Sequence, residues 1–436
     1  MNVCVIGTDQ IGLSTAILLA YLNHFVVIVD DNQTKIDLLK NNSLHYYEPY
    51  LNESISVINS NLYFTTDLTK AISCSDIIYL TSVNGYNASE ACRVFSETLK
   101  DKYRIFINKY SGRLGSTAIM EGIIREKSSN FSIVYEPSYI NNGSIIGDTF
   151  YPEKIVVGTR DMIVSKAIES IYKPLVNNTM LLPTFISKPH RKAPKLIWTD
   201  IESAELAYHT EKVFKGLKAS LINEINNISQ QYGGNTEQIL QILGSSDINN
   251  LQLKYGLGWS RHDYGASFEI LNEASIQSKI DIPLIKSALI SNYSQRTALV
   301  LKISKILHGL QGKTIGILGL TYKPFSDDIT DSPSIEIIQS LLSHKSIVKV
   351  HDPVVNFKMK LKFPQLNVMC CDAIEDLFKN TDIIILCTEW PEYLELDWFR
   401  LGDLMQTRYV FDARNVLSDQ DFTSMGYELF SFGTDN

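Results

Sequence analysis

The chain opens with an apolar run and a turn that contains two glycines, residues 3–12 (VCVIGTDQIG). A helix-like stretch follows as far as Asn23, and a second apolar run, residues 25–29 (FVVIV), ends at Asp30. Strand, tight turn, helix and strand in this order predict a βαβ unit, whose two strands are parallel because its crossover is right-handed. Helical patterns separate further strand candidates, which lie at residues 77–80, 105–108, 132–135 and 154–157. This alternation is typical of a doubly wound α/β sheet.

A long helical pattern separates this first sheet from a second one. Apolar residues recur at spacings of three and four from about Thr199 to Gln230, and helical segments continue to about Leu310. A second strand and glycine-containing turn lies at residues 313–320 (KTIGILGL), and strand candidates follow at 347–351, 382–387 and 409–412. We therefore expect an α/β fold with two Rossmann-like, doubly wound parallel-sheet domains joined by a long central helix and helical region. The expected boundaries are residues 1–198, 199–310 and 311–436.

The composition is ordinary for a globular protein and excludes some functions. The chain has 436 residues, of which 44% are hydrophobic and 20% charged, which is enough for two or three domains. Its formal net charge of -8 argues against a general nucleic-acid binder, because such proteins need a basic field that neutralises phosphates. A basic run from Lys188 to Lys195 contains two prolines and predicts a solvated loop.

Localisation and metal binding are also addressed by the sequence. No stretch approaches the roughly 20 apolar residues that span a bilayer, and no signal peptide precedes the first strand. We therefore expect a cytoplasmic protein with neither a membrane nor a nucleic acid as its partner. The six cysteines form no CxxC pair and the eight histidines form no HxxxH pair, so no metal site is expected.

The first turn has the spacing of a dinucleotide-binding fingerprint with one departure. Gly7 and Gly12 take the first and third glycine places, and Asp30 lies about 20 residues on, where it would accept from ribose hydroxyls. With Lys35, these are the expected cofactor-binding residues. The second glycine place holds Asp9, which adds bulk and negative charge where the pyrophosphate would lie. Two alternatives stay open: an NAD site that Asp9 weakens, or a turn in which this carboxylate is itself the anion that caps the helix.

Four segments along the chain resemble one known family. They are residues 47–49 (YEP), residues 204–225 from AEL to INEI, residues 319–333 (GLTYKPFSDDITDSP) and residues 411–415 (FDARN). Together they resemble the UDP-glucose/GDP-mannose dehydrogenase family over nearly the whole chain. The resemblance implies an N-terminal NAD domain, a central helical dimerisation region and a C-terminal domain that binds the nucleotide of the sugar. It also implies oxidation of a sugar C6 alcohol to an acid by two NAD molecules, through a cysteine thiohemiacetal.

The residues that perform this oxidation in the family are replaced in this chain. The cysteine, the loop aspartate, the lysine, the asparagine and the water-handling glutamate of the family correspond here to Asp263, Ser267, Tyr208, Lys212 and Ser138. A further position, a threonine in the family, is Ser111. A carboxylate cannot replace the thiolate, because its adduct would be an acylal that oxidises to an anhydride. We therefore expect no residue of the family's catalytic set, and no four-electron reaction.

The positions that contact the nucleotide in the family are better retained. Lys323 and Arg414 match the lysine and arginine that the resemblance assigns to the nucleotide sugar, and cations suit a diphosphate. An alternative is that both only form ion pairs with Asp327, Asp328 or Asp412. A loop arginine that the family supplies across its dimer falls near Asn249.

Two functions remain open. The first is a catalytically inactive relative that binds a nucleotide sugar, a UDP-sugar foremost, or a partner protein, on a homodimeric scaffold. The second is an NAD-dependent two-electron oxidoreductase that acts on a nucleotide sugar or a related alcohol. In that case Tyr208 and Lys212, one helical turn apart, would form the base, because a nearby lysine favours a phenolate.

Overall fold

The computed structural model describes residues 1–44, 46–58, 60–82, 86–99, 102–181, 183–184, 186, 192–244, 255–417 and 420–433. It divides into two compact units, Met1–Thr210 and Glu211–Asn436. Residues 188–191 of the basic run and Asn249 lie outside the described residues.

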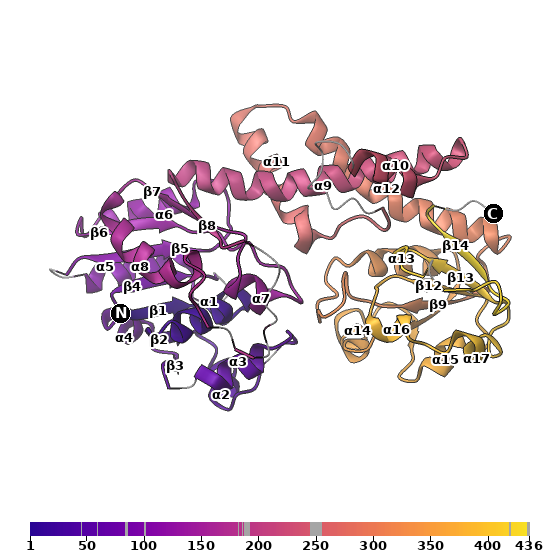
Figure 1. Ribbon diagram of the computed structural model, residues 1–436, viewed down its shortest axis with the longest axis horizontal. Helices are drawn as coiled ribbons and strands as arrows, with labels where there is room; N and C mark the ends of the chain where they lie inside the picture. Colours follow the sequence, from indigo (N-terminus) through magenta and orange to yellow (C-terminus); the bar gives the residue numbers. More distant parts are fainter. Residues whose placement is uncertain are drawn as a thin grey trace. The chain divides into compact units, whose positions relative to one another are not determined.

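The first unit is built on an eight-stranded sheet in the order β3-β2-β1-β4-β5-β6-β7-β8 (Figure 1). Its neighbouring strands are parallel except β6 and β7, which pair antiparallel. The strands are β1 (Asn2–Ile6), β2 (Phe25–Val29), β3 (Leu62–Thr65), β4 (Ile77–Leu80), β5 (Arg104–Asn108), β6 (Phe131–Tyr135), β7 (Lys154–Thr159) and β8 (Lys195–Thr199).

Helices cover both faces of this sheet because successive side chains of each strand point to opposite faces. Val3 and Val5 of β1 pack into one apolar cluster with α1, whereas Cys4 and Ile6 pack into another with α4, α5 and α6. The helices are α1 (Gln10–Tyr21), α2 (Gln33–Lys40), α3 (Leu51–Ile58), α4 (Leu68–Ser73), α5 (Ala88–Thr98), α6 (Ser116–Arg125), α7 (Ile145–Phe150), η1 (Met162–Val164) and α8 (Ser165–Val176).

Helix α9 (Ile201–Gln231) begins in the first unit and continues in the second. The helical part of the second unit also contains α10 (Thr236–Gly244), the π-helical turn η2 (Arg261–Gly265), α11 (Ala266–Ser278) and α12 (Pro283–Ile306). Its small core stacks Trp259 on Phe268, with ring centroids 4.5 Å apart, and adds Val213 and Ala288.

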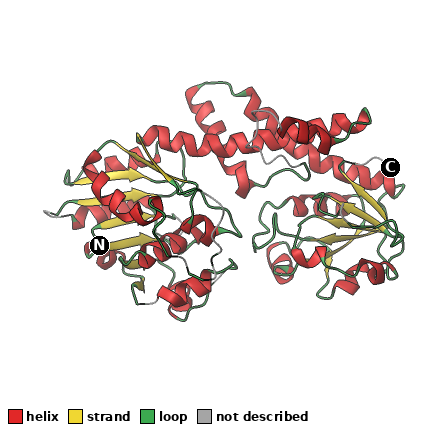
Figure 2. Cartoon of the chain, in the orientation of Figure 1, coloured by secondary structure: helices red, strands yellow, loops and turns green. Residues whose placement is uncertain are grey.

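The second sheet has six strands, all parallel, in the order β11-β10-β9-β12-β13-β14. The strands of both sheets are yellow in Figure 2. The strands are β9 (Thr314–Leu318), β10 (Ile347–His351), β11 (Val368–Cys370), β12 (Ile383–Leu386), β13 (Tyr409–Asp412) and β14 (Glu428–Ser431). The helices are α13 (Pro333–Ser343), α14 (Asn356–Lys362), α15 (Ile374–Phe378), α16 (Pro391–Leu394) and α17 (Trp398–Gly402).

The predicted fold class is confirmed, with two differences in detail. The sequence analysis did not predict β3, β8, β11 and β14, which are the edge strands of the two sheets. Edge strands are short and half exposed, so they lack the continuous apolar run that marks a central strand. The antiparallel β6–β7 pair was also not foreseen, because an apolar pattern does not give the direction of a strand. The three predicted domain boundaries stay a prediction.

Candidate functional site

The turn after β1 needs glycine for packing reasons. Gly7 has a φ of +114°, and a Cβ there would lie 2.7 Å from the Cβ of Ser82. A Cβ on Gly12 would lie 2.1 Å from the carbonyl oxygen of Gly7. Both glycines therefore allow α1 to start directly above the end of the strand, and this requirement holds with or without a dinucleotide.

Asp9 is the N-cap of α1. Its Oδ1 accepts from the backbone N–H of Gly12 at 2.8 Å, which is one of the two alternatives that the sequence left open. Burial raises the pKa of Asp9 to about 6, although hydrogen bonds from Gly12 and Ser82 and the charge of Lys35 act in the opposite direction. The helix terminus that would face a pyrophosphate thus already carries a carboxylate at neutral pH.

Asp30 is engaged within the protein as well. Its side chain lies in the buried turn, with 2% of the residue exposed, and Oδ2 accepts from the backbone N–H and the hydroxyl of Thr8. Oδ1 accepts from the backbone N–H of Asn32 at 3.0 Å, and Lys35 Nζ lies 3.8 Å from Oδ2. Asp30 and Lys35 are therefore paired with each other, and Asp30 holds the first turn against the second strand.

Two more helices of the first unit are capped by carboxylates from distant segments. Glu48 accepts from the backbone N–H groups of Gly143 and Ile145, both at 2.9 Å, at the start of α7. Glu205, near the start of α9, accepts from the backbone N–H groups of Gly115 at 2.6 Å and Thr117 at 3.0 Å, at the start of α6. Both glutamates belong to segments that carry the family resemblance, and in this chain both stabilise the fold.

Two of the replaced positions of the first unit, Ser138 and Tyr208, lie near the end of β6 and on α9. Ser138 is 8% exposed and follows the strand by three residues. The ring of Tyr208 lies 5.4 Å from that of Tyr139, centroid to centroid, at an interplanar angle of 58°. Lys212 follows on α9, in the second unit.

Asp263, at the place of the family's cysteine, is engaged by its own turn. It forms a capping box with Ser260: Oδ2 accepts from the Ser260 backbone N–H at 3.2 Å and hydroxyl at 3.0 Å, while Asp263 N–H donates to Ser260 Oγ at 3.1 Å. Ser267 is 6% exposed in the first turn of α11. A carboxylate that begins a helix in this way stabilises the helix terminus.

An ion pair ties η2 to the segment before α13. His262 Nε2 lies 2.9 Å from Asp328 Oδ2, and this bond raises the pKa of His262. Burial alone would raise the pKa of Asp328, but the hydrogen bond and charge of His262 lower it to about 2. Arg261 Nη1 lies 4.0 Å from Asp331 of the same segment. The sequence analysis missed this link, because nothing in the spacing relates positions 262 and 328.

The two predicted nucleotide contacts, Lys323 and Arg414, follow strands β9 and β13 of the second sheet. Arg414 donates to the carbonyl oxygens of Tyr322 and Cys387, and its Nε lies 3.2 Å from Glu389 Oε2. Its ion pair is therefore with Glu389 and not with the aspartates considered from the sequence. Lys323 Nζ lies 5.4 Å from the ring centroid of Tyr322.

Comparison with known proteins decides the family. Residues 1–176 match the NAD binding domain of the UDP-glucose/GDP-mannose dehydrogenase family, residues 202–294 its central domain and residues 316–419 its UDP binding domain. The chain belongs to this family. One relative is the UDP-glucose 6-dehydrogenase of Rickettsia felis. This chain is 28% identical to it, over 100% of this chain and 96% of the relative.

Other members of the family give the same result. The chain is 28% identical to the UDP-glucose 6-dehydrogenase YwqF of Bacillus subtilis, over 99% of this chain and 98% of the relative. A UDP-glucose dehydrogenase from Pyrobaculum islandicum has a similar structure, with a TM-score of 0.84 at 23% identity, over 98% of this chain and 96% of that one. This structural match supports the fold.

One buried ion pair was not expected from the sequence. Lys109 Nζ lies 2.6 Å from Glu136 Oε1, directly after strands β5 and β6. The only signal in the sequence was a charged residue at the end of each of these two apolar runs. Within the described ranges, no group of His, Cys, Asp or Glu side chains is arranged to hold a metal ion. No helix of the described chain is long and apolar enough to cross a bilayer.

Proposed function

We propose that this chain is a non-oxidising member of the UDP-glucose/GDP-mannose dehydrogenase family that binds a nucleotide sugar. The observation that carries the proposal is the role of Asp263 in its own helical turn. The residue at the place of the family's cysteine has no thiol, and its carboxylate caps its own helical turn. Without a thiolate there is no thiohemiacetal, so the second oxidation of a four-electron reaction has no starting point.

The nucleotide contacts of the proposal are Lys323 and Arg414. A guanidinium has five N–H donors, and the structure shows two nitrogens of Arg414, Nε and Nη2, donating to carbonyl oxygens. These bonds fix the side chain at the end of the sheet and leave Nη1 for a phosphate oxygen. Glu389, 3.2 Å from Nε, reduces the positive charge, so we expect binding to be weaker than an unpaired arginine would give.

The proposal includes weak NAD binding. The second glycine place of the first turn holds the carboxylate of Asp9, which accepts from the backbone N–H of Gly12, so a bound pyrophosphate would lie close to a negative charge. Asp30, the expected acceptor for the ribose hydroxyls, is present but already accepts from Thr8 and Asn32. NAD is the cofactor of the family, and we expect it to bind here in the millimolar range or not at all.

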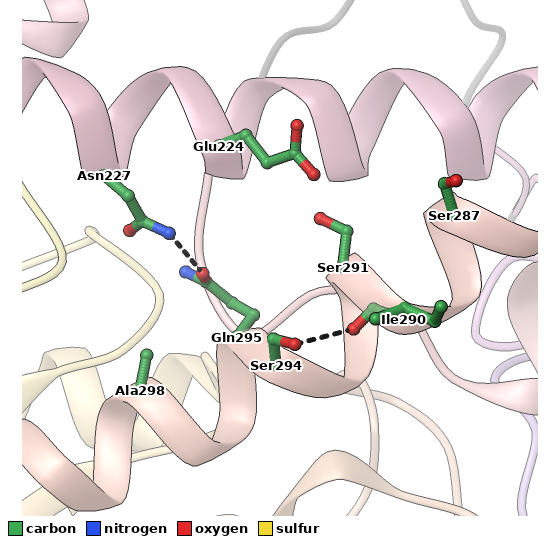
Figure 3. A pocket seen from close by; sticks show the side chains of 8 residues that line it. All are labelled: Glu224, Asn227, Ser287, Ile290, Ser291, Ser294, Gln295 and Ala298. Atoms are coloured by element: carbon green, nitrogen blue, oxygen red, sulfur yellow. Dashed lines mark hydrogen bonds between the residues drawn. The ribbon is translucent and has the colours of Figure 1, made fainter. Parts of the chain in front are cut away.

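The proposal also includes a cytoplasmic homodimer that forms through the helical region of the second unit. Phe214, Leu221 and Ile228 of α9 follow each other at intervals of seven, on one face of the helix, and are 60%, 56% and 56% exposed. A groove of about 390 Å³ lies between α9 and α12. Small side chains such as Ser287, Ser291 and Ser294 line it (Figure 3). An exposed apolar stripe is typical of an interface, and a second copy supplies the matching stripe.

A binding panel with an activity assay tests this function. The protein is titrated with UDP-glucose, UDP, GDP-mannose and NAD, and the unfolding temperature is followed, because a ligand of the folded state raises it. We expect a rise with UDP-glucose, no rise with NAD below millimolar concentration, and no NADH release when both are present. Uronic acid formation would overturn the proposal. One NADH per alcohol converted would favour the two-electron alternative instead.

A further inference from the structure

The strand order of the second sheet reverses between β9 and β12. Strands β10 and β11 lie on one side of β9, whereas β13 and β14 lie on the other side of β12. In open α/β sheets a ligand binds outside the carboxyl ends of the strands at such a switch point. The segments that follow β9, β12 and β13 are therefore where we expect a ligand of this unit.

One side chain at this switch point has an unusual backbone conformation. Phe325, in the segment after β9, has a φ of +61°. A bulky residue rarely adopts this left-handed conformation, which glycine and asparagine adopt at lower cost. The backbone therefore does not explain why an aromatic residue stands at this position, and strain of this kind is concentrated at ligand sites.

Trp390, in the segment after β12, supports the ring of Phe325. The two ring centroids lie 5.6 Å apart at an interplanar angle of 70°. Trp390 is 1% exposed, and its indole N–H donates to the buried Asp352 at 3.2 Å. Because the contact is edge to face, it covers at most one face of the Phe325 ring, and 38% of Phe325 is exposed. The ring is thus fixed on one side and accessible on another.

The cations that we assign to the diphosphate lie in the same segments. Lys323 precedes Phe325 by two residues, so their Cα atoms are at most about 7 Å apart. Arg414, after β13, donates to the carbonyl oxygen of Tyr322 and so holds the segment that carries both. Positive charge beside an exposed aromatic ring is the combination that binds a phosphate and a planar base of one nucleotide.

We propose that Phe325 is a stacking platform for the base of a nucleoside diphosphate. This inference rests on the proposed function and adds the residue that recognises the planar part of the ligand. Stacking on an aromatic side chain contributes about five- to hundredfold in affinity and depends little on which base is bound. Phe325 therefore favours a ligand that carries a base over a sugar phosphate without one.

Three variants test the ring. Phe325→Asn removes it and introduces a residue that favours the left-handed conformation, so we expect the turn to fold. Phe325→Tyr keeps an aromatic ring. Phe399→Asn is the matched control, because Phe399 is a 59% exposed phenylalanine of the same unit, on α17. Urea unfolding verifies that each variant is folded.

UDP is the probe for the full chain and its variants. Calorimetric titration measures its affinity, and saturation-transfer NMR compares its uracil protons with its ribose protons. We expect the uracil protons to receive the stronger saturation in the unmodified chain. Phe325→Asn should bind UDP about tenfold more weakly and lose this preference, whereas Phe325→Tyr and Phe399→Asn should keep both.

The outcomes separate this inference from the proposed function. Absence of UDP binding to the unmodified chain would overturn both. Equal affinity of the unmodified chain and Phe325→Asn for UDP would overturn the stacking role alone. So would a weaker uracil than ribose signal in the unmodified chain, or a loss in Phe325→Asn that affects both signals alike.

Discussion

The turn after β1 and the turn after β9 take the same place in their two sheets and can be compared atom by atom. In each, a glycine with positive φ donates its N–H to the last residue of the second strand at 2.9 Å, Gly7 to Val29 and Gly319 to His351. In each, an aspartate that follows the second strand is 2% exposed and accepts backbone N–H groups of the turn, Asp30 in the first sheet and Asp352 in the second.

The difference lies in the charges placed in the turn. After Gly7 the chain enters α1 at once, with the carboxylate of Asp9 at the helix terminus. After Gly319 it runs past Lys323 before α13 begins at Pro333. The comparison teaches that the glycine and the buried aspartate belong to the scaffold of such a turn. They do not by themselves indicate a dinucleotide, and we expect the charge within the turn to decide which ligand it accepts.

Glycine substitution tests the common scaffold and has the largest expected effect. A Cβ would lie 2.1 Å from Gly7 O at position 12 and 2.3 Å from Thr388 Cβ at position 319. We expect Gly12→Ala and Gly319→Ala each to lower the free energy of unfolding by about 3 kcal/mol in urea titrations. The control is Gly122→Ala inside α6, where the Cβ meets open space. It should raise stability by about 0.5 kcal/mol, and equal stability of all three variants would contradict the packing argument.

Replacing either buried aspartate should lower the free energy of unfolding in proportion to the number of hydrogen bonds that it accepts. Asp352 accepts from the backbone N–H groups of Leu320, Thr321, Val354 and Val355 and from the indole of Trp390. Asp30 accepts fewer hydrogen bonds among those described above, and their donors are Thr8 and Asn32. We expect Asp352→Asn to cost about 3 kcal/mol and Asp30→Asn about 1.5 kcal/mol by urea unfolding. A larger loss for Asp30→Asn would mean that the two turns are not equivalent.

Removing the negative charge of Asp9 from the turn after β1 tests how this turn differs from the turn after β9. Asp9→Ser keeps a residue that caps helices but removes the carboxylate, so we expect NAD to bind about tenfold more tightly in calorimetric titrations. The matched control is Asp67→Ser, which changes the N-cap of α4, where Asp67 accepts from Lys70 N–H at 2.9 Å. NAD affinity that is unchanged in Asp9→Ser would show that the carboxylate is not what excludes the cofactor.

The pH dependence of NAD binding is the smallest expected effect. Because burial raises the pKa of Asp9 to about 6, this carboxyl is ionised at pH 7.5 and mostly neutral at pH 5.5. Because the folded-state pKa is raised, protonation of Asp9 favours the folded state as the pH falls through 6. We expect the NAD affinity of the unmodified chain to increase about threefold between pH 7.5 and 5.5, and Asp9→Ser to lack this increase. An opposite slope in the unmodified chain would assign the titration to another group.

Sequence patterns predicted the central strands of both sheets, because buried strands are continuous apolar runs with turns at both ends. They also predicted that Asp9 could act as a helix cap, since capping depends on neighbours within three residues. The Lys109–Glu136 pair was not predictable, because its partners are 27 positions apart and meet only through the pairing of β5 with β6. The capping box of Ser260 and Asp263 is local and has the expected spacing of three residues, yet it was not predicted, because no apolar helical period marks the short turn η2 that it begins.

The caps that Glu48 and Glu205 provide also constrain the order in which the chain folds. The bond from Gly143 to Glu48 joins residues 95 positions apart, and the bond from Gly115 to Glu205 joins residues 90 positions apart. During synthesis, α6 leaves the ribosome long before Glu205, so its first turn stays uncapped until the start of α9 has emerged. We therefore expect the first unit to complete its folding late and a fragment that ends before Glu205 to have a frayed α6.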